Sequence, residues 1–270
     1  MEITPPSFDP FHSNRNKGLH TKKMTRTNKA EIHVLSLDGG GSRGIMESIM
    51  LGHVMDVSTL MTEKPSKIIE ILSNFQLDAP GVGKKFQSLI EVENLSPIHP
   101  TEAFQYIVGT STGSLIAFGL VGGKESQNGK RVPFSVKEVT ELYQDVIPKI
   151  FMKAKNGNGF KDWALEKKGS VGGIPTTPYT QKLLKLAVDE KFGTALTEDI
   201  EHNGCLAGAV ARQFNEDPAR PDLLEIFDSK SDPAQLVSEV LLGSSDAPIY
   251  FEVPSQIGHR NYIDGGVAGV

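Results

Sequence analysis

The stretch Tyr106–Leu120, YIVGTSTGSLIAFGL, decides the fold of this chain. Its apolar start runs into the pentapeptide Gly109-Thr110-Ser111-Thr112-Gly113, and an apolar, helix-compatible run follows. The pattern predicts a strand, a tight turn and a helix. In that setting GxSxG indicates a nucleophile elbow, in which Ser111 sits on a strained turn and Gly109 and Gly113 let the strand and helix approach closely. The N–H groups at the start of the helix would favour a developing negative charge.

The pentapeptide is weak evidence by itself, because Gly and Ser are common in turns. The chain holds 27 glycines among 270 residues, so a chance match is a realistic alternative. An ordinary strand-to-helix turn remains open until other segments are considered.

A second glycine-rich turn precedes the elbow. Residues 32–37 read as a short strand, Asp38-Gly39-Gly40-Gly41-Ser42-Arg43-Gly44 as a loop, and IMESIMLGHVM as a helix. Glycines allow the backbone to approach a ligand and to present several N–H groups to an anion. The loop therefore predicts a site for a phosphate or an oxyanion.

This loop also satisfies the dinucleotide fingerprint GxGxxG through Gly39, Gly41 and Gly44. A nucleotide-binding unit requires in addition an acidic residue that closes the second strand about twenty residues on. Glu63 lies in that region, but its surroundings read as helix or loop. The fingerprint is incomplete, and nucleotide binding stays an alternative.

A third segment, Tyr262-Ile263-Asp264-Gly265-Gly266, places Asp264 at the end of an apolar run. Site residues in open α/β sheets gather at strand ends. The rival is a Ser-His-Asp triad that uses His202 or His259, with a carboxylate such as Asp246 orienting the latter. Because His259 stands in a polar turn, we expect it to be an exposed loop residue.

Taken together, the three segments resemble the patatin-like phospholipase family, whose signature is a DGGGxRG loop, a GxSxG elbow and a later Asp-Gly pair. PKIF at 148–151, KFG at 191–193 and DAPIYF at 246–251 are similar to further family landmarks. The resemblance covers about residue 31 to the end. It implies an α/β fold, specifically a three-layer α/β/α domain with a largely parallel central sheet.

The resemblance also implies a lipid acyl hydrolase of the phospholipase A type that cleaves esters of phospholipids or related glycerolipids through an acyl-enzyme. Ser111 would be the nucleophile and Asp264 the base of a dyad without histidine. The oxyanion hole would come from Gly39, Gly40 and Gly41, with Arg43 and Gly44 supporting the loop. No cofactor or metal is implied. A phospholipid or glycolipid substrate implies transient contact with a membrane surface, and an inactive lipid-binding module is the remaining alternative.

Two departures from the family pattern stand out. The spacing from Gly41 to Ser111 is longer than usual, and residues 76–103 read as a surface insertion. Family members usually continue beyond the position of Val270, so we expect a domain over 31–270 that either is truncated at its C-terminal end or lacks the final helices of the family.

Composition bounds the setting. The chain has no apolar run of about 18 residues and no signal-peptide core. Its single cysteine, Cys205, excludes an internal disulfide framework. These features predict a cytoplasmic protein. The resemblance adds peripheral contact with membranes and no nucleic acid partner. Residues 1–30 hold six Lys or Arg against two acidic residues, net +4, which leaves −9 for the rest of a chain of net charge −5. By its charge this basic leader is either solvated and disordered or attracted to an anionic surface, that of a membrane or of a nucleic acid.

The remaining pattern predicts helices over 59–75 (interrupted at Pro65), 135–147 (with a Ser135–Glu138 capping box, ended or kinked by Pro148), 179–192 (stopped by Gly193) and 233–242. Buried strands are predicted over 206–211 and 223–227, a strand over 249–253, and a long mobile loop over 153–177.

Overall fold

The computed structural model describes residues 31–74, 81–150, 181–215, 223–248, 250–251 and 254–267. Contacts group Ile32–Val270 into one compact unit. The basic leader and the loop expected over 153–177 lie outside the described residues. The predicted domain boundary near residue 31 stays a prediction.

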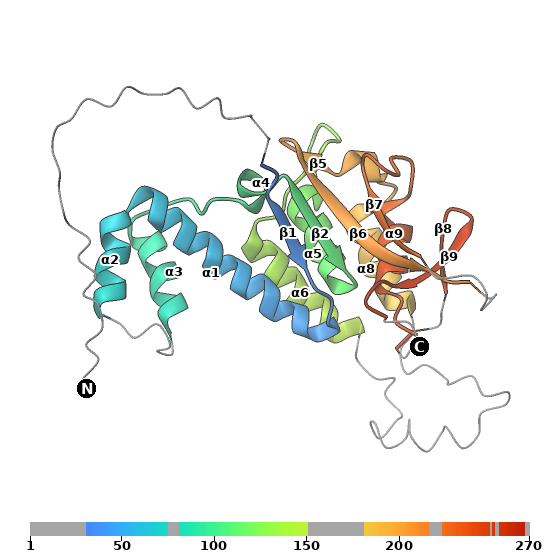
Figure 1. Cartoon of the computed structure of the whole chain (residues 1–270), viewed down its shortest axis with the longest axis horizontal. Coiled ribbons are helices and arrows are strands. Elements are labelled where there is room, and N and C mark those ends of the chain that lie inside the picture. Colours follow the sequence, from blue (N-terminus) through green and yellow to red (C-terminus); the bar gives the residue numbers. More distant parts are fainter. Residues whose placement is uncertain are drawn as a thin grey trace, which may run out of the picture. The chain divides into compact units, whose positions relative to one another are not determined.

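The centre of the fold is a sheet in which three strands run parallel, β1 (Val34–Leu37), β2 (Tyr106–Thr110) and β6 (Cys205–Gln213) (Figure 1). Four more strands are antiparallel to their neighbours: β5 (Glu201–His202) and β7 (Leu224–Asp228) pair with β6, β9 (Arg260–Asp264) pairs with β6, and β8 (Ser255–Ile257) pairs with β9. The sheet is therefore mixed, with a parallel centre that carries the elbow.

The pairing register of β6 brings the C-terminal ends of β2 and β9 together. Thr110 of β2 pairs with Val210, and Asp264 of β9 pairs with the next residue, Ala211. Since β7 occupies the other edge of β6 across these positions, β2 and β9 share one edge and approach each other end to end. Residues that follow β2 consequently lie beside the end of β9.

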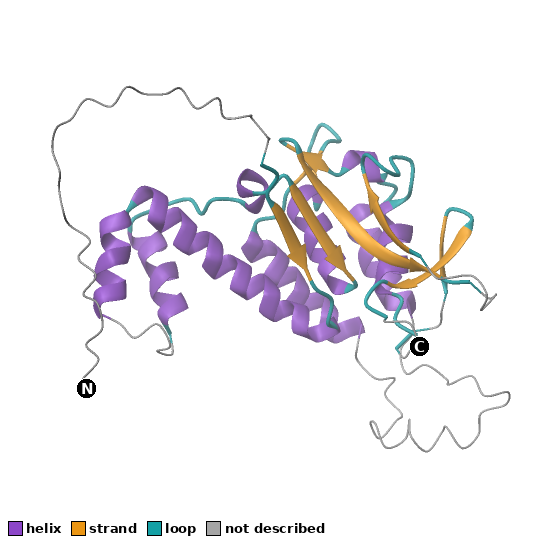
Figure 2. Ribbon diagram, viewed as in Figure 1, coloured by secondary structure: helices purple, strands orange, loops and turns teal. Residues whose placement is uncertain are grey.

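Helices cover one face of this sheet within the described residues (Figure 2). Helix α5 (Thr112–Gly122) packs on β2 and β6, and α9 (Val237–Ser245) packs on β6, β8 and β9. Helices α1 (Gly44–Glu63), α6 (Val136–Ile150) and α8 (Gln181–Phe192) pack around α5 and α9. On the opposite face Val108, Leu206 and Val210 are half-buried. The predicted α/β class with a parallel centre is confirmed, and of its three layers the described residues form the sheet and the helices of one face.

Residues near the predicted insertion form their own small apolar cluster. Helix α2 (Pro65–Asn74) begins at the predicted break, and α3 (Val82–Val92) packs on α1. Leu60, Ile68, Phe86 and Ile90 are buried together there, apart from the main core. The short helix α4 (Pro100–Ala103) then leads into β2, and a hairpin of β3 (Lys124–Glu125) and β4 (Arg131–Val132) follows α5.

Several local predictions are confirmed. Ser135 and Glu138 form the predicted capping box, in which the Glu138 N–H donates to Ser135 Oγ and the Ser135 N–H donates to Glu138 Oε2. Gly193, with a φ of 55°, follows the last residue of α8. Positive φ at that position suits glycine and ends the helix.

Other local predictions need correction. Of the two outcomes predicted at Pro148, an end of the helix is wrong, because α6 continues through Pro148 to Ile150. Strand β7 is buried only in part, because Leu224 and Ile226 are 64% and 47% exposed while Phe227 is 3% exposed. The helix predicted from residue 233 begins at Val237. Of the strand predicted over 249–253, only Tyr250 and Phe251 are described; they lie in a turn, and the next strand begins at Ser255.

Candidate active site

Ser111 occupies the turn between β2 and α5 in a strained backbone conformation, with φ 55° and ψ −129°. The turn is so tight that neither flanking glycine has room for a side chain. A Cβ on Gly109 would lie 2.2 Å from the carbonyl carbon of Gly113, and a Cβ on Gly113 would lie 2.3 Å from the carbonyl oxygen of Leu37. This is the geometry of a nucleophile elbow.

The glycine loop that follows β1 lies directly against Ser111. Leu37 pairs with Gly109, so β1 and β2 end at the same level. A Cβ on Gly39 would lie 2.5 Å from the Cβ of Ser111. Gly41 has a φ of 57°, a conformation that favours glycine. The loop therefore presents its backbone, not side chains, to the serine.

Asp264 completes the site from the end of β9. The Ser111 side chain lies beside its carboxylate, and the N–H of Gly266 donates a hydrogen bond to Oδ1 at 2.8 Å. Asp264 is only 5% exposed. Burial raises the pKa of the carboxyl group, and the neighbouring Ser111 hydroxyl and Gly266 N–H oppose this effect without cancelling it. A buried carboxylate with a raised pKa accepts a proton more readily than one in water.

These elements line one pocket of about 1070 Å³. Polar and backbone groups gather at one part of its wall: Gly39, Gly40, Gly41, Arg43, Ser111 and Asp264. Apolar side chains of the helices and of the turn after α9 complete it: Ile147, Ile150, Leu184, Pro248, Phe251 and Val267.

Two residues that hold the glycine loop and the elbow in position were not predicted from the sequence. The Tyr143 hydroxyl, on α6, donates a hydrogen bond to the carbonyl oxygen of Gly41. Ser244, on α9, accepts a hydrogen bond from the Ser111 N–H through Oγ at 3.2 Å and donates to the carbonyl oxygen of Val210 at 2.7 Å. Both are buried. From the sequence, Tyr143 has the helical spacing of an ordinary core residue, and Ser244 follows the predicted helix as an ordinary loop residue. Neither position therefore indicated a role at the site.

Gly44 and Arg43, the two residues predicted to support the glycine loop, differ in their contacts. Gly44 starts α1 against Tyr143, since a Cβ on Gly44 would lie 2.4 Å from the Tyr143 hydroxyl. The Arg43 side chain is exposed and lines the pocket. Within the described residues its guanidinium has no hydrogen bond or ion pair. Tyr143 makes the contact expected of Arg43, whose supporting role stays a prediction.

The rival sites are not assembled in the described part of the chain. His259 lies in the exposed turn between β8 and β9, His202 lies in β5, and neither lines the pocket around Ser111. Glu63 ends α1 and is followed by α2, so no strand end places it as a nucleotide site requires. This geometry supports neither a Ser-His-Asp triad nor dinucleotide binding.

Two further carboxyl groups lie near the site. Burial raises the pKa of Asp246 to about 7, and the neighbouring charge of Asp264 adds to the effect. The side chains of Gln181 and Ser255 approach Asp246, but its oxygens have no hydrogen bond of regular geometry among the described residues. Glu47 of α1 lies close to Asp38, and burial raises its pKa to about 7 as well.

The fold and the site define a class of protein: an α/β fold with a serine on a nucleophile elbow, a facing glycine loop and a buried carboxylate. The chain belongs to the patatin-like phospholipase family, whose model matches residues 91–269. That match includes Ser111 and Asp264, while the glycine loop precedes it. The predicted family and its α/β/α fold class are confirmed.

Relatives agree with this assignment. The chain is 27% identical to patatin-like protein 2 of Oryza sativa subsp. indica, over 88% of this chain and 50% of the relative. It is 25% identical to patatin-like protein 4 of Arabidopsis thaliana, over 87% and 49%. Its structure is similar to that of VipD from Legionella pneumophila, with a TM-score of 0.42 and 13% identity over 88% of this chain and 46% of the other. The chain spans about half the length of the curated relatives it matches.

Proposed function

We propose that this chain carries a lipid acyl hydrolase of the phospholipase A type, with Ser111 as nucleophile and Asp264 as general base. The observation that carries the proposal is the placement of Ser111 beside the buried Asp264 carboxylate in one pocket, on a strained turn that faces the glycine loop. Membership of the patatin-like phospholipase family supports the same reaction class.

In the proposed mechanism, Ser111 Oγ attacks the ester carbonyl carbon while its proton passes to Asp264. The N–H groups of Gly39, Gly40 and Gly41 stabilise the oxyanion, and each such donor contributes about 10²- to 10³-fold to the rate. Collapse of the intermediate breaks the ester C–O bond, and the leaving alcohol takes the proton from Asp264. Water, deprotonated by Asp264, then releases the fatty acid and restores Ser111.

The site suits a substrate with an apolar chain and one ester at its end. Apolar side chains from α6, α8 and the turn after α9 surround the polar groups, and burial of methylene groups there is favourable. Access to such a substrate implies contact with a lipid surface. No helix in the described residues combines the length and apolarity needed to cross a bilayer.

Labelling with a serine-reactive fluorophosphonate tests the proposal directly. We expect the probe to attach at Ser111, as read by peptide mass spectrometry, and Ser111→Ala to lose both labelling and ester hydrolysis while keeping the wild-type circular dichroism spectrum. Ser42→Ala is the matched control, because Ser42 also lines the pocket but is not the proposed nucleophile. Hydrolysis retained by Ser111→Ala would reject the assignment.

A further inference from the structure

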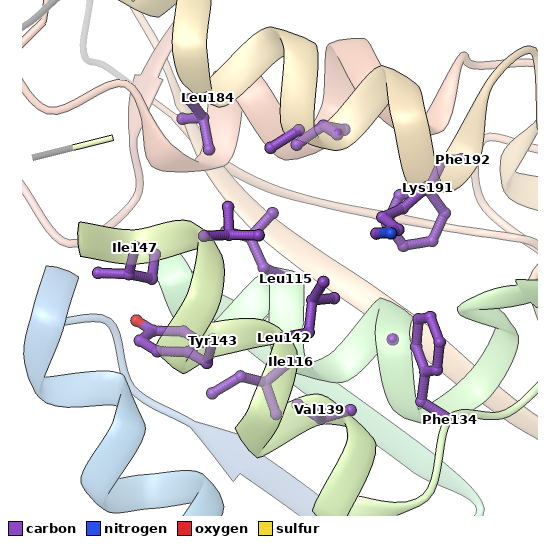
Figure 3. A pocket seen from close by; sticks show the side chains of 14 residues that line it. Leu115, Ile116, Phe134, Val139, Leu142, Tyr143, Ile147, Leu184, Lys191 and Phe192 are labelled. Atoms are coloured by element: carbon purple, nitrogen blue, oxygen red, sulfur yellow. The ribbon is translucent and has the colours of Figure 1, made fainter. Parts of the chain in front are cut away.

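A narrow apolar crevice lies between α6 and α8, beside the pocket that contains Ser111. Its volume is about 60 Å³. Most of its wall is carbon, from side chains such as Leu115, Ile116, Val139 and Leu142 (Figure 3). A polar ligand would lose its water there without gaining hydrogen bonds, which is costly. The crevice therefore suits a hydrocarbon.

Two side chains line both the crevice and the pocket around Ser111. Ile147 of α6 and Leu184 of α8 line the crevice and also the pocket around Ser111. They are 5% and 3% exposed, so they form a packed partition. Rotation of these two side chains would join the crevice to the site without moving a helix.

Tyr143 links the crevice to the glycine loop. Its ring lines the crevice, while its hydroxyl donates a hydrogen bond to the carbonyl oxygen of Gly41. In Figure 3, Tyr143 and Ile147 lie at one side of the crevice. An ester carbonyl held at the glycine loop would thus have its acyl chain close to the partition.

The opposite end of the crevice is closed by two aromatic rings, Phe134 and Phe192 (Figure 3). The Lys124 amine lies 5.4 Å from the centroid of the Phe134 ring, and the Arg131 guanidinium lies 5.3 Å from that of Phe192. Arg131 also donates to the backbone carbonyl oxygens of Gly122 and Lys191 at 2.8 Å. Because these contacts hold the rings in place, the crevice has a fixed end.

We propose that this crevice binds the terminal carbons of the substrate's acyl chain and so sets the preferred chain length. The inference rests on the proposed acyl hydrolase function. A water-sized group occupies about 30 Å³, so a crevice of about 60 Å³ holds roughly two methylene groups. The rest of the chain lies in the larger pocket, and the two rings stop longer chains.

The test is the chain-length profile of kcat/KM on soluble 4-nitrophenyl esters with acyl chains of two to ten carbons, measured with the full chain. Each methylene buried contributes a factor of roughly four. We expect kcat/KM to rise by about this factor per carbon and to level off once the crevice is full.

The levelling point is the acyl-chain length at which kcat/KM stops rising. We expect two variants to move it in opposite directions. Ala187 and Leu142 line the crevice and not the pocket around Ser111. Ala187→Leu fills the crevice and is expected to shorten the optimum by about two carbons, a loss of roughly 15-fold for the longest favoured ester. Leu142→Ala enlarges it and is expected to lengthen the optimum. Leu186→Phe is the control, because Leu186 is 55% exposed on α8.

Opposite shifts of the levelling point in the two variants, with none in Leu186→Phe, support the inference. An unchanged levelling point in variants that still hydrolyse the short esters overturns it while leaving the proposed function intact. If Ala187→Leu does not fold, Leu142→Ala decides by itself. Wild-type protein that hydrolyses none of the esters would reject the proposed function, and the inference with it.

Discussion

The backbone N–H of Asp264 donates a hydrogen bond to the backbone carbonyl oxygen of Asp246 at 3.1 Å. This contact ties the end of β9 to the residue that follows α9. The Asp246 side chain is fully buried, and its pKa is raised by burial and by the charge of Asp264. Two carboxyl groups are therefore held together at the site, and we expect their protonation to affect both stability and activity.

Asp246 makes the stability of the protein depend on pH. Its pKa rises from 3.8 to about 7 on folding, so the folded state binds the proton more tightly than the unfolded state. The resulting stability is complete below about pH 4 and is lost as the pH rises through about 7. One pKa unit corresponds to about 1.4 kcal/mol, so the loss reaches up to roughly 4 kcal/mol.

Asp246→Asn should remove this dependence, since the amide does not titrate. Urea unfolding at pH 4.5 and pH 8 measures it: wild-type protein loses stability between these values relative to the variant. Asp145→Asn, on the exposed side of α6, is the control and should follow the wild type. Parallel curves for wild type and Asp246→Asn would show that Asp246 is not the titrating group.

Asp264→Asn decides between dyad and triad. The amide matches the carboxylate in shape but does not accept the serine proton, so we expect kcat to fall by about 10²- to 10⁴-fold. His259→Ala should keep wild-type activity, because His259 lies in an exposed turn that does not line the pocket. Both are measured on one soluble ester at one pH, and the reverse pattern would indicate a histidine-dependent hydrolase.

Tyr143→Phe tests the support of the glycine loop. The change removes the hydrogen bond to the Gly41 carbonyl oxygen and keeps the ring. We expect kcat to fall by up to about tenfold with little change in KM, because the loop acts mainly on the transition state.

Tyr106→Phe is the matched control for that experiment. Tyr106 donates a hydrogen bond to Asp228 Oδ2 at 2.6 Å, at the end of β2 away from the elbow. Its loss should lower stability and leave kcat unchanged. Equal effects of the two variants on kcat would mean that Tyr143 contributes only to folding.

Gly109→Ala tests the packing of the elbow. The added Cβ would lie 2.2 Å from the backbone of Gly113, so strand and helix must separate, and we expect a loss of more than about 3 kcal/mol. Gly52→Ala is the contrast, since its Cβ would meet Val136 at an ordinary 3.7 Å inside α1. It should stabilise the protein by about 0.5–1 kcal/mol, and thermal unfolding measures both.

Local chemistry allowed much of this protein to be predicted from sequence. The elbow at Ser111, the glycine loop after β1 and the capping box at Ser135 each depend on residues a few positions apart, so their pattern is visible in the chain. The break at Pro65 and the stop at Gly193 follow from the backbone restrictions of proline and glycine. Asp264 was recognisable because an apolar run delivers it to a strand end.

The tertiary structure alone decided how these segments meet. The end-to-end approach of β2 and β9 along one edge of β6 results from pairing between residues that are 100 positions apart for β2 and β6 and 49 to 53 positions apart for β6 and β9, which local pattern does not encode. For the same reason the sequence did not identify Tyr143 and Ser244, whose partners lie on distant elements. The exposure of β7 likewise depends on which helices pack nearby. The sequence determined which residues are the candidate reacting groups, and long-range packing determined their distances, burial and proton affinity.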